Sequence, residues 1–139
     1  MKNISKNLQM FNQVCKETNV IYHDYAAKNG ISDTAFWIMY SVYYYGEGIT
    51  QKNICEEWFY SAQTVNSSLK TMEKNGLIIL EPSNDNKKEK QIHFTKEGQL
   101  LAEKIIKPVI EAEKQSFEQL DNFMSEVIIT YVSIADKTA

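Results

Sequence analysis

The stretch from residue 61 to residue 95 constrains the fold most, because its hydrophobic period changes at a single glycine. Val65, Leu69 and Met72 fall on one face of a helix, at about 100° per residue. After Gly76 the segments LIILEP and KQIHFT have the residue types of two strands, and the polar turn SNDNKKE separates them. The sequence therefore predicts a helix that runs into a β-hairpin with a long loop.

Further helices are expected on both sides of this unit. The N-cap residues Ser32, Thr50 and Thr95 mark three helix starts, and Gly30 is placed to end the first helix of the chain. Pro108 lies inside a long predicted helix and should kink it, because proline removes one backbone hydrogen bond. The expected helices, besides the one after Ser61, cover residues 4–28, 33–45, 51–58, 96–120 and 123–136.

This order of elements predicts a mainly α protein with a small β-hairpin wing (α+β), which is a winged helix-turn-helix. We expect one domain over residues 1–139, with the winged helix lobe at 31–98 and dimerisation helices at 1–30 and 99–139. The end helices have more apolar surface than one small domain can bury, and packing between two copies would cover it. Their apolar stripes are Ile4, Leu8, Phe11, Cys15, Thr18 and Tyr22 in the first helix, and Met124, Val127, Ile128, Tyr131 and Ile134 in the last.

Composition excludes several other classes of protein. The chain has 139 residues, of which 43% are hydrophobic, and no apolar run approaches the roughly 18 residues that cross a membrane. With no signal-peptide pattern either, a cytoplasmic protein is expected. Two cysteines and two histidines have no metal-ligand spacing, so no metal or cofactor is expected. Phosphate-loop and nucleophile-elbow motifs are missing, so we do not expect an enzyme.

The outward face of the helix after Ser61 has the side chains that read DNA. Opposite the apolar face lie Gln63, Ser67, Lys70 and Lys74, with Thr64 and Asn66 on the flanks. Glutamine pairs with adenine, lysine with guanine, and hydroxyl groups contact bases or phosphates. An ordinary solvated helix face is the alternative interpretation, since most exposed faces are polar. The short helix before it and the lysines Lys87, Lys88 and Lys90 after it favour DNA.

The chain resembles the MarR family of bacterial transcriptional regulators. The residues that carry the resemblance are GIS before the second helix, GITQKNICEEW over the third, and SAQTVNSSLKTMEKNGLIILEP after it. The wing motif of the family corresponds to Asp85-Asn86-Lys87, with lysine in place of arginine, and the strand that follows it corresponds to IHFTKEG. The order of elements agrees over essentially the whole chain.

This resemblance implies a DNA-binding regulator, a repressor that binds a palindromic operator in double-stranded DNA as an obligate homodimer. It also implies release by a small ligand or by oxidation. The recognition helix would use its outward residues, the start of the third helix would touch the DNA backbone, and Asp85 would support the wing. The matching positions are Ser61, Gln63, Thr64, Asn66, Ser67 and Lys70 in the recognition helix, Thr50, Gln51 and Lys52 in the third helix, and Lys87 in the wing.

Two further interpretations stay open at this stage. Aromatic residues of the second helix are more often core than pocket, but the resemblance implies a ligand site beside that helix. Trp37, Tyr40 and Tyr44 are therefore candidates to bind a small aromatic ligand. The rival function is a winged-helix dimer that acts through protein contacts, with weak DNA binding or none.

Overall fold

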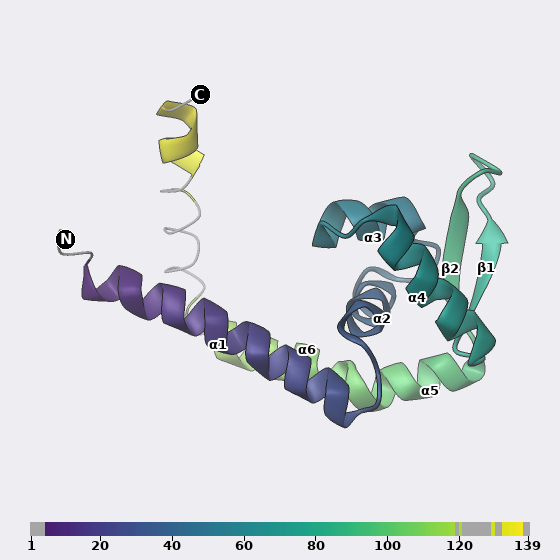
Figure 1. Ribbon diagram of the computed structural model, residues 1–139, viewed down its shortest axis with the longest axis horizontal. Helices are drawn as coiled ribbons and strands as arrows, with labels where there is room; N and C mark the ends of the chain where they lie inside the picture. Colours follow the sequence, from purple (N-terminus) through teal and green to yellow (C-terminus); the bar gives the residue numbers. More distant parts are fainter. Residues whose placement is uncertain (1–4, 119, 121–128, 130–131, 138–139) are drawn as a thin grey trace. The chain divides into compact units, whose positions relative to one another are not determined.

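The computed structural model describes residues 5–118, 120, 129 and 132–137, and it divides the chain into two compact units, Met1–Ile106 and Lys107–Ala139. The first unit contains five helices and a two-stranded sheet among its described residues (Figure 1). Its elements are α1 (Lys6–Lys28), α2 (Asp33–Tyr45), α3 (Gln51–Trp58), α4 (Ala62–Lys74), β1 (Ile78–Pro82), β2 (Lys90–Phe94) and α5 (Lys96–Ile105). The second unit contains α6 (Lys107–Glu118). This confirms the mainly helical winged fold predicted from the sequence.

The predicted helix starts are confirmed by their caps. The side chains of Ser32, Thr50 and Thr95 each accept a hydrogen bond from a backbone N–H of the first turn that follows. Each bond satisfies an amide that has no partner within its helix.

The prediction of one long helix over residues 96–120 is wrong. α5 ends at Ile105 and α6 begins at Lys107, so two helices replace one. Pro108 is the second residue of α6. At that position its missing N–H has no partner within α6, so proline is compatible with a helix start here.

The core of the first unit is built around α2, which packs against α1, α3, α4, α5 and β2. Figure 1 shows α3 and α4 side by side with the hairpin next to α4. Most of α2 is apolar, so it is buried on several sides at once, whereas α4 buries one face only. The largest fully buried side chains include Phe36, Ile38 and Met39 of α2, Ile54 of α3, Leu69 of α4, and Ile78 and Ile92 of the hairpin.

The hairpin is attached to the segment before α3. β1 and β2 pair antiparallel, with Leu80 opposite Ile92. On its other edge, β2 exchanges backbone hydrogen bonds with the segment before α3, because Ile92 N–H donates to Ile49 (2.8 Å) and Gly48 N–H donates to the Ile92 carbonyl (3.1 Å). This pairing fixes the base of the wing against the start of α3.

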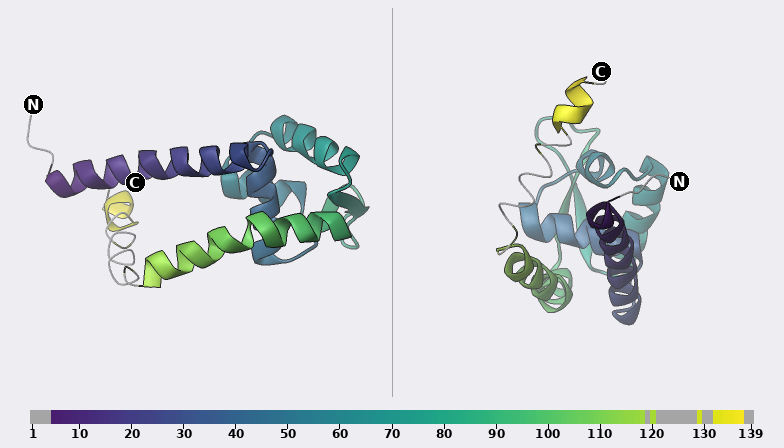
Figure 2. Two further views of the ribbon diagram at one scale, coloured as in Figure 1. Left: turned by 90° about the horizontal axis from the view of Figure 1, so that it is seen from below. Right: turned by 90° about the vertical axis from the view of Figure 1, so that its left-hand side faces the viewer.

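The apolar stripe of α1 is partly exposed within one copy of the chain, and Thr18 and Tyr22 at its C-terminal end are half-buried. Leu8 and Cys15 are exposed, and Phe11 is half-buried. In Figure 2 the N-terminal part of α1 extends beyond the lobe formed by α2–α5. Of the other predicted stripe residues, Ile134 is exposed in the helical segment 132–137, whereas Ile4, Met124, Val127, Ile128 and Tyr131 lie outside the described residues. In the part of the chain that is described, no helix has both the length and the apolarity to span a membrane.

Candidate nucleic-acid interface

The start of α4 is held by a hydroxyl cap. Ser61 Oγ accepts the Thr64 N–H (3.1 Å), and the Ser61 and Thr64 hydroxyls are hydrogen-bonded to each other (2.8 Å). Both side chains are exposed at the first turn of the helix. Because a helix N-terminus presents free N–H groups and a partial positive charge, this end of α4 suits a phosphate group.

The outward face of α4 is free to meet a partner. Val65, Leu69 and Met72 are buried on the opposite side, as the periodicity predicted. Among the described residues, no hydrogen bond or ion pair engages the side chains that share the outward face. These exposed side chains are Gln63, Asn66, Lys70 and Lys74. Ser67 is exposed between them, and its carbonyl accepts the Thr71 hydroxyl (3.1 Å). The face therefore combines amide, hydroxyl and ammonium groups on one rigid helix.

The three candidate residues at the start of α3 all form contacts within the lobe. Thr50 forms a capping box with Asn53, and Lys52 Nζ lies 3.9 Å from Glu56 in an exposed pair. Gln51 Nε2 donates to the Ala62 carbonyl, at 2.9 Å. This last bond joins the first residue of α3 to the first residue of α4. Gln51 therefore sets the position of the α4 N-terminus, a role that the sequence did not indicate because the two residues lie 11 positions apart.

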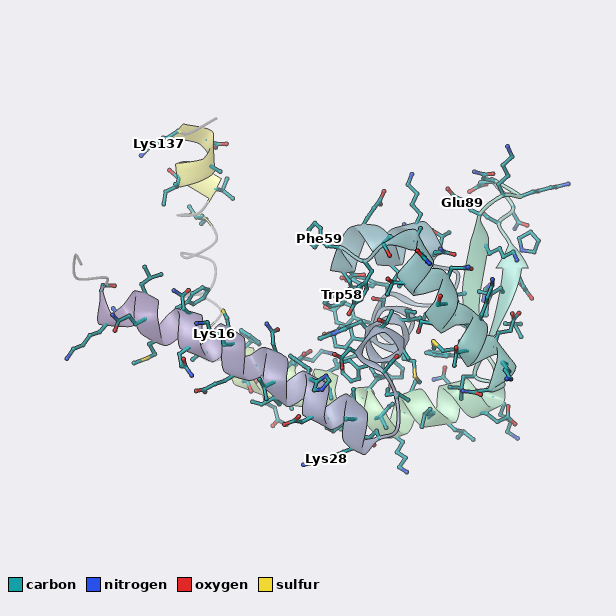
Figure 3. The ribbon with its side chains drawn as sticks, in the orientation of Figure 1. Lys16, Lys28, Trp58, Phe59, Glu89 and Lys137 are labelled. Atoms are coloured by element: carbon teal, nitrogen blue, oxygen red, sulfur yellow. The ribbon has the colours of Figure 1, made fainter. Side chains whose placement is uncertain are left out.

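The wing carries exposed lysines on a loop that its own hydrogen bonds shape. Lys87, Lys88 and Lys90 are exposed. Ser83 N–H donates to the Glu89 carbonyl (2.8 Å) and Glu89 N–H to the Asn86 carbonyl (2.9 Å), while Asn86 Oδ1 accepts the Lys88 N–H (3.1 Å). Figure 3 shows Glu89 on the hairpin loop.

The resemblance implied that Asp85 supports the wing loop, but in the structure other residues shape this loop. Ser83, which is buried, accepts the Asp85 N–H on its hydroxyl at 3.4 Å. Within the described ranges, the Asp85 carboxylate accepts no hydrogen bond. Asn86 and Ser83 therefore shape the loop, and the preference of both residue types for turns was the signal that could have indicated them.

A cluster of one histidine and two glutamates, which sequence reasoning missed, lies at the base of the wing. His93 Nδ1 is 3.3 Å from Glu47 Oε2, and His93 Nε2 is 3.6 Å from Glu81 Oε2. The other oxygen of Glu47 accepts the Phe94 N–H at 3.2 Å. Glu47 comes from the segment before α3, Glu81 from β1 and His93 from β2, so the cluster joins the wing to the helical part of the lobe.

His23 forms another histidine–carboxylate contact, between α1 and the first residue of α2. Its Nδ1 atom lies 2.9 Å from Asp33 Oδ2 and 3.0 Å from Asp33 Oδ1. The hydrogen bond to Asp33, and then the negative charge of Asp33, raise the pKa of His23 above its ordinary 6.5. The folded state thus favours the protonated imidazole.

We expect the stability difference between the wild type and His23→Ala to depend on pH. Because the folded-state pKa of His23 is raised, its contribution is fully present below the unfolded pKa of 6.5 and is lost as pH rises through the folded pKa. Urea unfolding of both proteins at about pH 5.5 and about pH 8.5 should give the larger difference at the lower pH. An equal difference at both pH values would contradict the assigned role.

The candidate aromatic pocket is mostly filled by its own side chains. Trp37 stacks on Trp58 with ring centroids 4.2 Å apart, and Tyr40 stacks on Tyr44 at 5.9 Å. Trp37 and Tyr40 are half-buried, and only Tyr44, at 53% exposure, presents much of its ring to solvent. In this structure the three rings pack against one another and their neighbours.

A cavity of about 400 Å³ lies elsewhere, between the α1–α2 turn and α4. Hydroxyl groups from both sides line it, including those of Ser32, Thr34, Ser67 and Thr71. None of Trp37, Tyr40 and Tyr44 belongs to its lining. Across the described ranges, no group of three or more His, Cys, Asp and Glu residues could hold a metal ion.

Three helices followed by a hairpin, with a polar face on the last helix and lysines on the hairpin loop, define a winged helix-turn-helix protein. Residues 29–89 match the model of the MarR family, and this match agrees with the resemblance predicted from the sequence. No curated protein matches the sequence.

Several solved structures share the fold over nearly the whole chain. A MarR family regulator from Neisseria meningitidis superimposes with a TM-score of 0.73 at 18% identity, covering 96% of this chain and 94% of that one. A SlyA-like transcription regulator from Listeria monocytogenes gives 0.66 at 23% identity, covering 99% and 92%. A mutant of S. aureus MepR bound to an oligodeoxyribonucleotide gives 0.58 at 19% identity, covering 94% and 98%.

Proposed function

We propose that this protein is a cytoplasmic transcriptional repressor that binds a palindromic operator in double-stranded DNA as a homodimer. The observation that carries the proposal is the outward face of α4. It presents Gln63, Asn66, Ser67 and Lys70 without partners for their side chains, on a helix whose opposite face is anchored in the core. A helix of this kind can enter the major groove and keep its register there.

Backbone contacts would come from the wing and from the start of α4. The exposed lysines of the wing supply charge, and the capped N-terminus of α4 supplies backbone N–H groups for phosphate. Lysine is a point charge without the planar fork of arginine, so these contacts would add affinity and little sequence discrimination. Specificity then falls to the polar side chains of α4.

Dimer formation follows from the apolar surface of α1. Leu8, Met10, Val14, Val20 and Ile21 are exposed within one copy, and together they extend over most of the helix. An exposed apolar surface of this extent is a normal mark of an interface between protein chains. Two copies would present two α4 helices, and this symmetry matches a palindromic site. Sedimentation at micromolar concentration should find no folded monomer.

Release by a small ligand is the regulatory part of the proposal. The candidate site on α2 would bind an aromatic ligand on the exposed ring of Tyr44, beside Trp37 and Tyr40. The rival function, a winged-helix dimer that works through protein contacts, predicts the same dimer without salt-dependent DNA affinity.

A DNA-binding experiment distinguishes the repressor from the protein-contact dimer. It uses the purified protein and the region upstream of its own gene. Affinity should be measured at two salt concentrations, with a scrambled duplex of equal length as the control. A specific complex that weakens steeply with salt supports the repressor. No difference between the two duplexes, with weak binding to both at low salt, would favour the protein-contact function.

Lys87→Ala should weaken binding to operator and scrambled DNA alike. The side chain is exposed on the wing loop and has no partner among the described residues, so its loss removes one charge and leaves the fold intact. We expect the slope of log K against log salt to flatten by about 1 for each wing that touches DNA. Fluorescence anisotropy over a salt series measures this slope.

Lys28→Ala is the matched control for Lys87. Figure 3 shows Lys28 at the end of α1, far from the hairpin loop that carries Glu89, so removing this lysine should leave the salt slope unchanged. If Lys87→Ala behaves like Lys28→Ala, the wing does not contact DNA.

A further inference from the structure

Phe59 occupies a backbone conformation that an aromatic residue rarely adopts. It has φ 56° and ψ 31°, in the left-handed region, and it is the one non-glycine residue with positive φ among the described residues. Side chains with a β-carbon are disfavoured there, so glycine or asparagine would be the expected C-cap of α3. Observed strain of this kind is a reason to look for a function.

The side chain of Phe59 buries almost no surface within the fold. It is 93% exposed, the highest value among the exposed large hydrophobic residues. Its neighbours are anchored, because Trp58 donates its indole N–H to Ser41 Oγ (2.8 Å) and stacks on Trp37. Tyr60 is half-buried, and burial raises the pKa of its hydroxyl. Figure 3 shows Trp58 directed toward α2 and Phe59 directed away from the lobe.

The turn therefore packs Trp58 and Tyr60 against the lobe and leaves the Phe59 side chain exposed. Phe59 lies two residues before Ser61, the N-cap of α4. From Phe59 to Met72 the chain contains no acidic residue and one lysine. On the other side of the ring, the exposed Glu56 of α3 lies 3.9 Å from Lys52, which offsets its charge. Apolar side chains contact thymine methyl groups at the edge of the major groove.

We infer that Phe59 is an apolar DNA contact, with its ring against a thymine methyl group or a deoxyribose where α4 enters the major groove. This inference rests on the proposed DNA-binding function. It adds an apolar contact to the polar face of α4, from a residue whose backbone the turn holds in the left-handed region.

Phe59→Gly and Phe59→Asn test the inference, because each removes the ring and also fits the left-handed backbone. For both variants we expect a higher Tm than the wild type, since the strain is relieved and no buried contact is lost. We expect the Kd for the operator to rise on the order of fivefold to tenfold. Opposite changes in stability and affinity exclude misfolding as the cause of weaker binding.

Two control variants complete the experiment. Phe59→Tyr keeps the ring and should bind like the wild type. Ile79→Ala removes a different exposed apolar side chain, on β1, and should also leave DNA affinity unchanged. Sedimentation of each variant establishes whether the oligomeric state is preserved.

The outcomes separate this inference from the function on which it rests. If the wild type binds the operator and both ring-removing variants bind equally well, the Phe59 contact is wrong and the repressor function stands. If those variants change the oligomeric state instead, Phe59 is a contact between protein copies and the inference is overturned. If the wild type binds no DNA at low salt, the proposed function itself fails and the inference fails with it.

Discussion

Gly98→Ala should destabilise the lobe by about 3 kcal/mol or more, through a backbone clash that no side-chain movement can relieve. A β-carbon on Gly98 would lie 1.8 Å from the Leu77 carbonyl oxygen and 2.8 Å from its carbonyl carbon. Leu77 cannot retreat easily, because its oxygen accepts the Thr95 N–H (3.0 Å) and the Thr95 hydroxyl donates to the Gly76 carbonyl (2.5 Å). These bonds tie the start of α5 to the turn between α4 and β1.

Urea unfolding followed by circular dichroism measures this effect, as a fall in the midpoint at an unchanged m-value. Gln99→Ala is the matched control, since Gln99 is the next residue of α5 and is exposed. It should change the free energy of unfolding by no more than about 0.5 kcal/mol. A Gly98→Ala protein as stable as the Gln99→Ala protein would show that α5 does not pack against Leu77 as closely as the structure places it.

Local features of the chain were predictable from the sequence because they depend on neighbouring residues. The cap at Ser61 and the glycine at position 76 define α4 within a few residues, and the buried face of Val65, Leu69 and Met72 follows from the helical period. The two strands follow from alternation and from the turn residues between them. With the order of elements, these features were sufficient to predict a winged helix and a resemblance to the MarR family.

Features that join distant parts of the chain were not predictable in the same way. The bond from Gln51 to Ala62 and the cluster of His93 with Glu47 and Glu81 depend on tertiary placement, which a single sequence does not encode at any fixed spacing. The sequence predicted a kink at Pro108, but the end of α5 at Ile105 was not predicted because the apolar pattern continues through Ile106. The DNA contacts, the dimer and the domain boundaries stay predictions.

The strained backbone at Phe59 is another feature that depends on tertiary packing. Nothing in the segment EEWFYS marks position 59 as left-handed, because a tight turn between two helices can place its positive φ at more than one residue. The anchoring of Trp58 and Tyr60 decides it, and that anchoring depends on α2. A site can thus combine residues that the sequence indicates with others that only the packing of the lobe brings to the surface.

Gln63→Ala should cost about 1–3 kcal/mol of operator binding and almost nothing on scrambled DNA. Gln63 is the second residue of α4, exposed and without a partner among the described residues. Its amide can donate to one atom of a base and accept from another, which is the pairing that adenine offers in the major groove. Alanine is at least as good a helix former as glutamine, so the substitution should leave α4 and its cap intact.

Anisotropy titrations with the operator duplex and the scrambled duplex, at one salt concentration, give the ratio of operator affinity to scrambled-duplex affinity. This ratio should fall for Gln63→Ala, because only the complex with the operator weakens. Lys70→Ala is the informative comparison on the same face, since an ammonium group near phosphate contributes to both complexes and its loss should lower both affinities together. The pair of variants thus distinguishes base readout from charge on a single helix. If Gln63→Ala lowers both affinities equally, Gln63 contacts the DNA backbone, and specificity lies with Ser67, Asn66 or the deformation of the DNA.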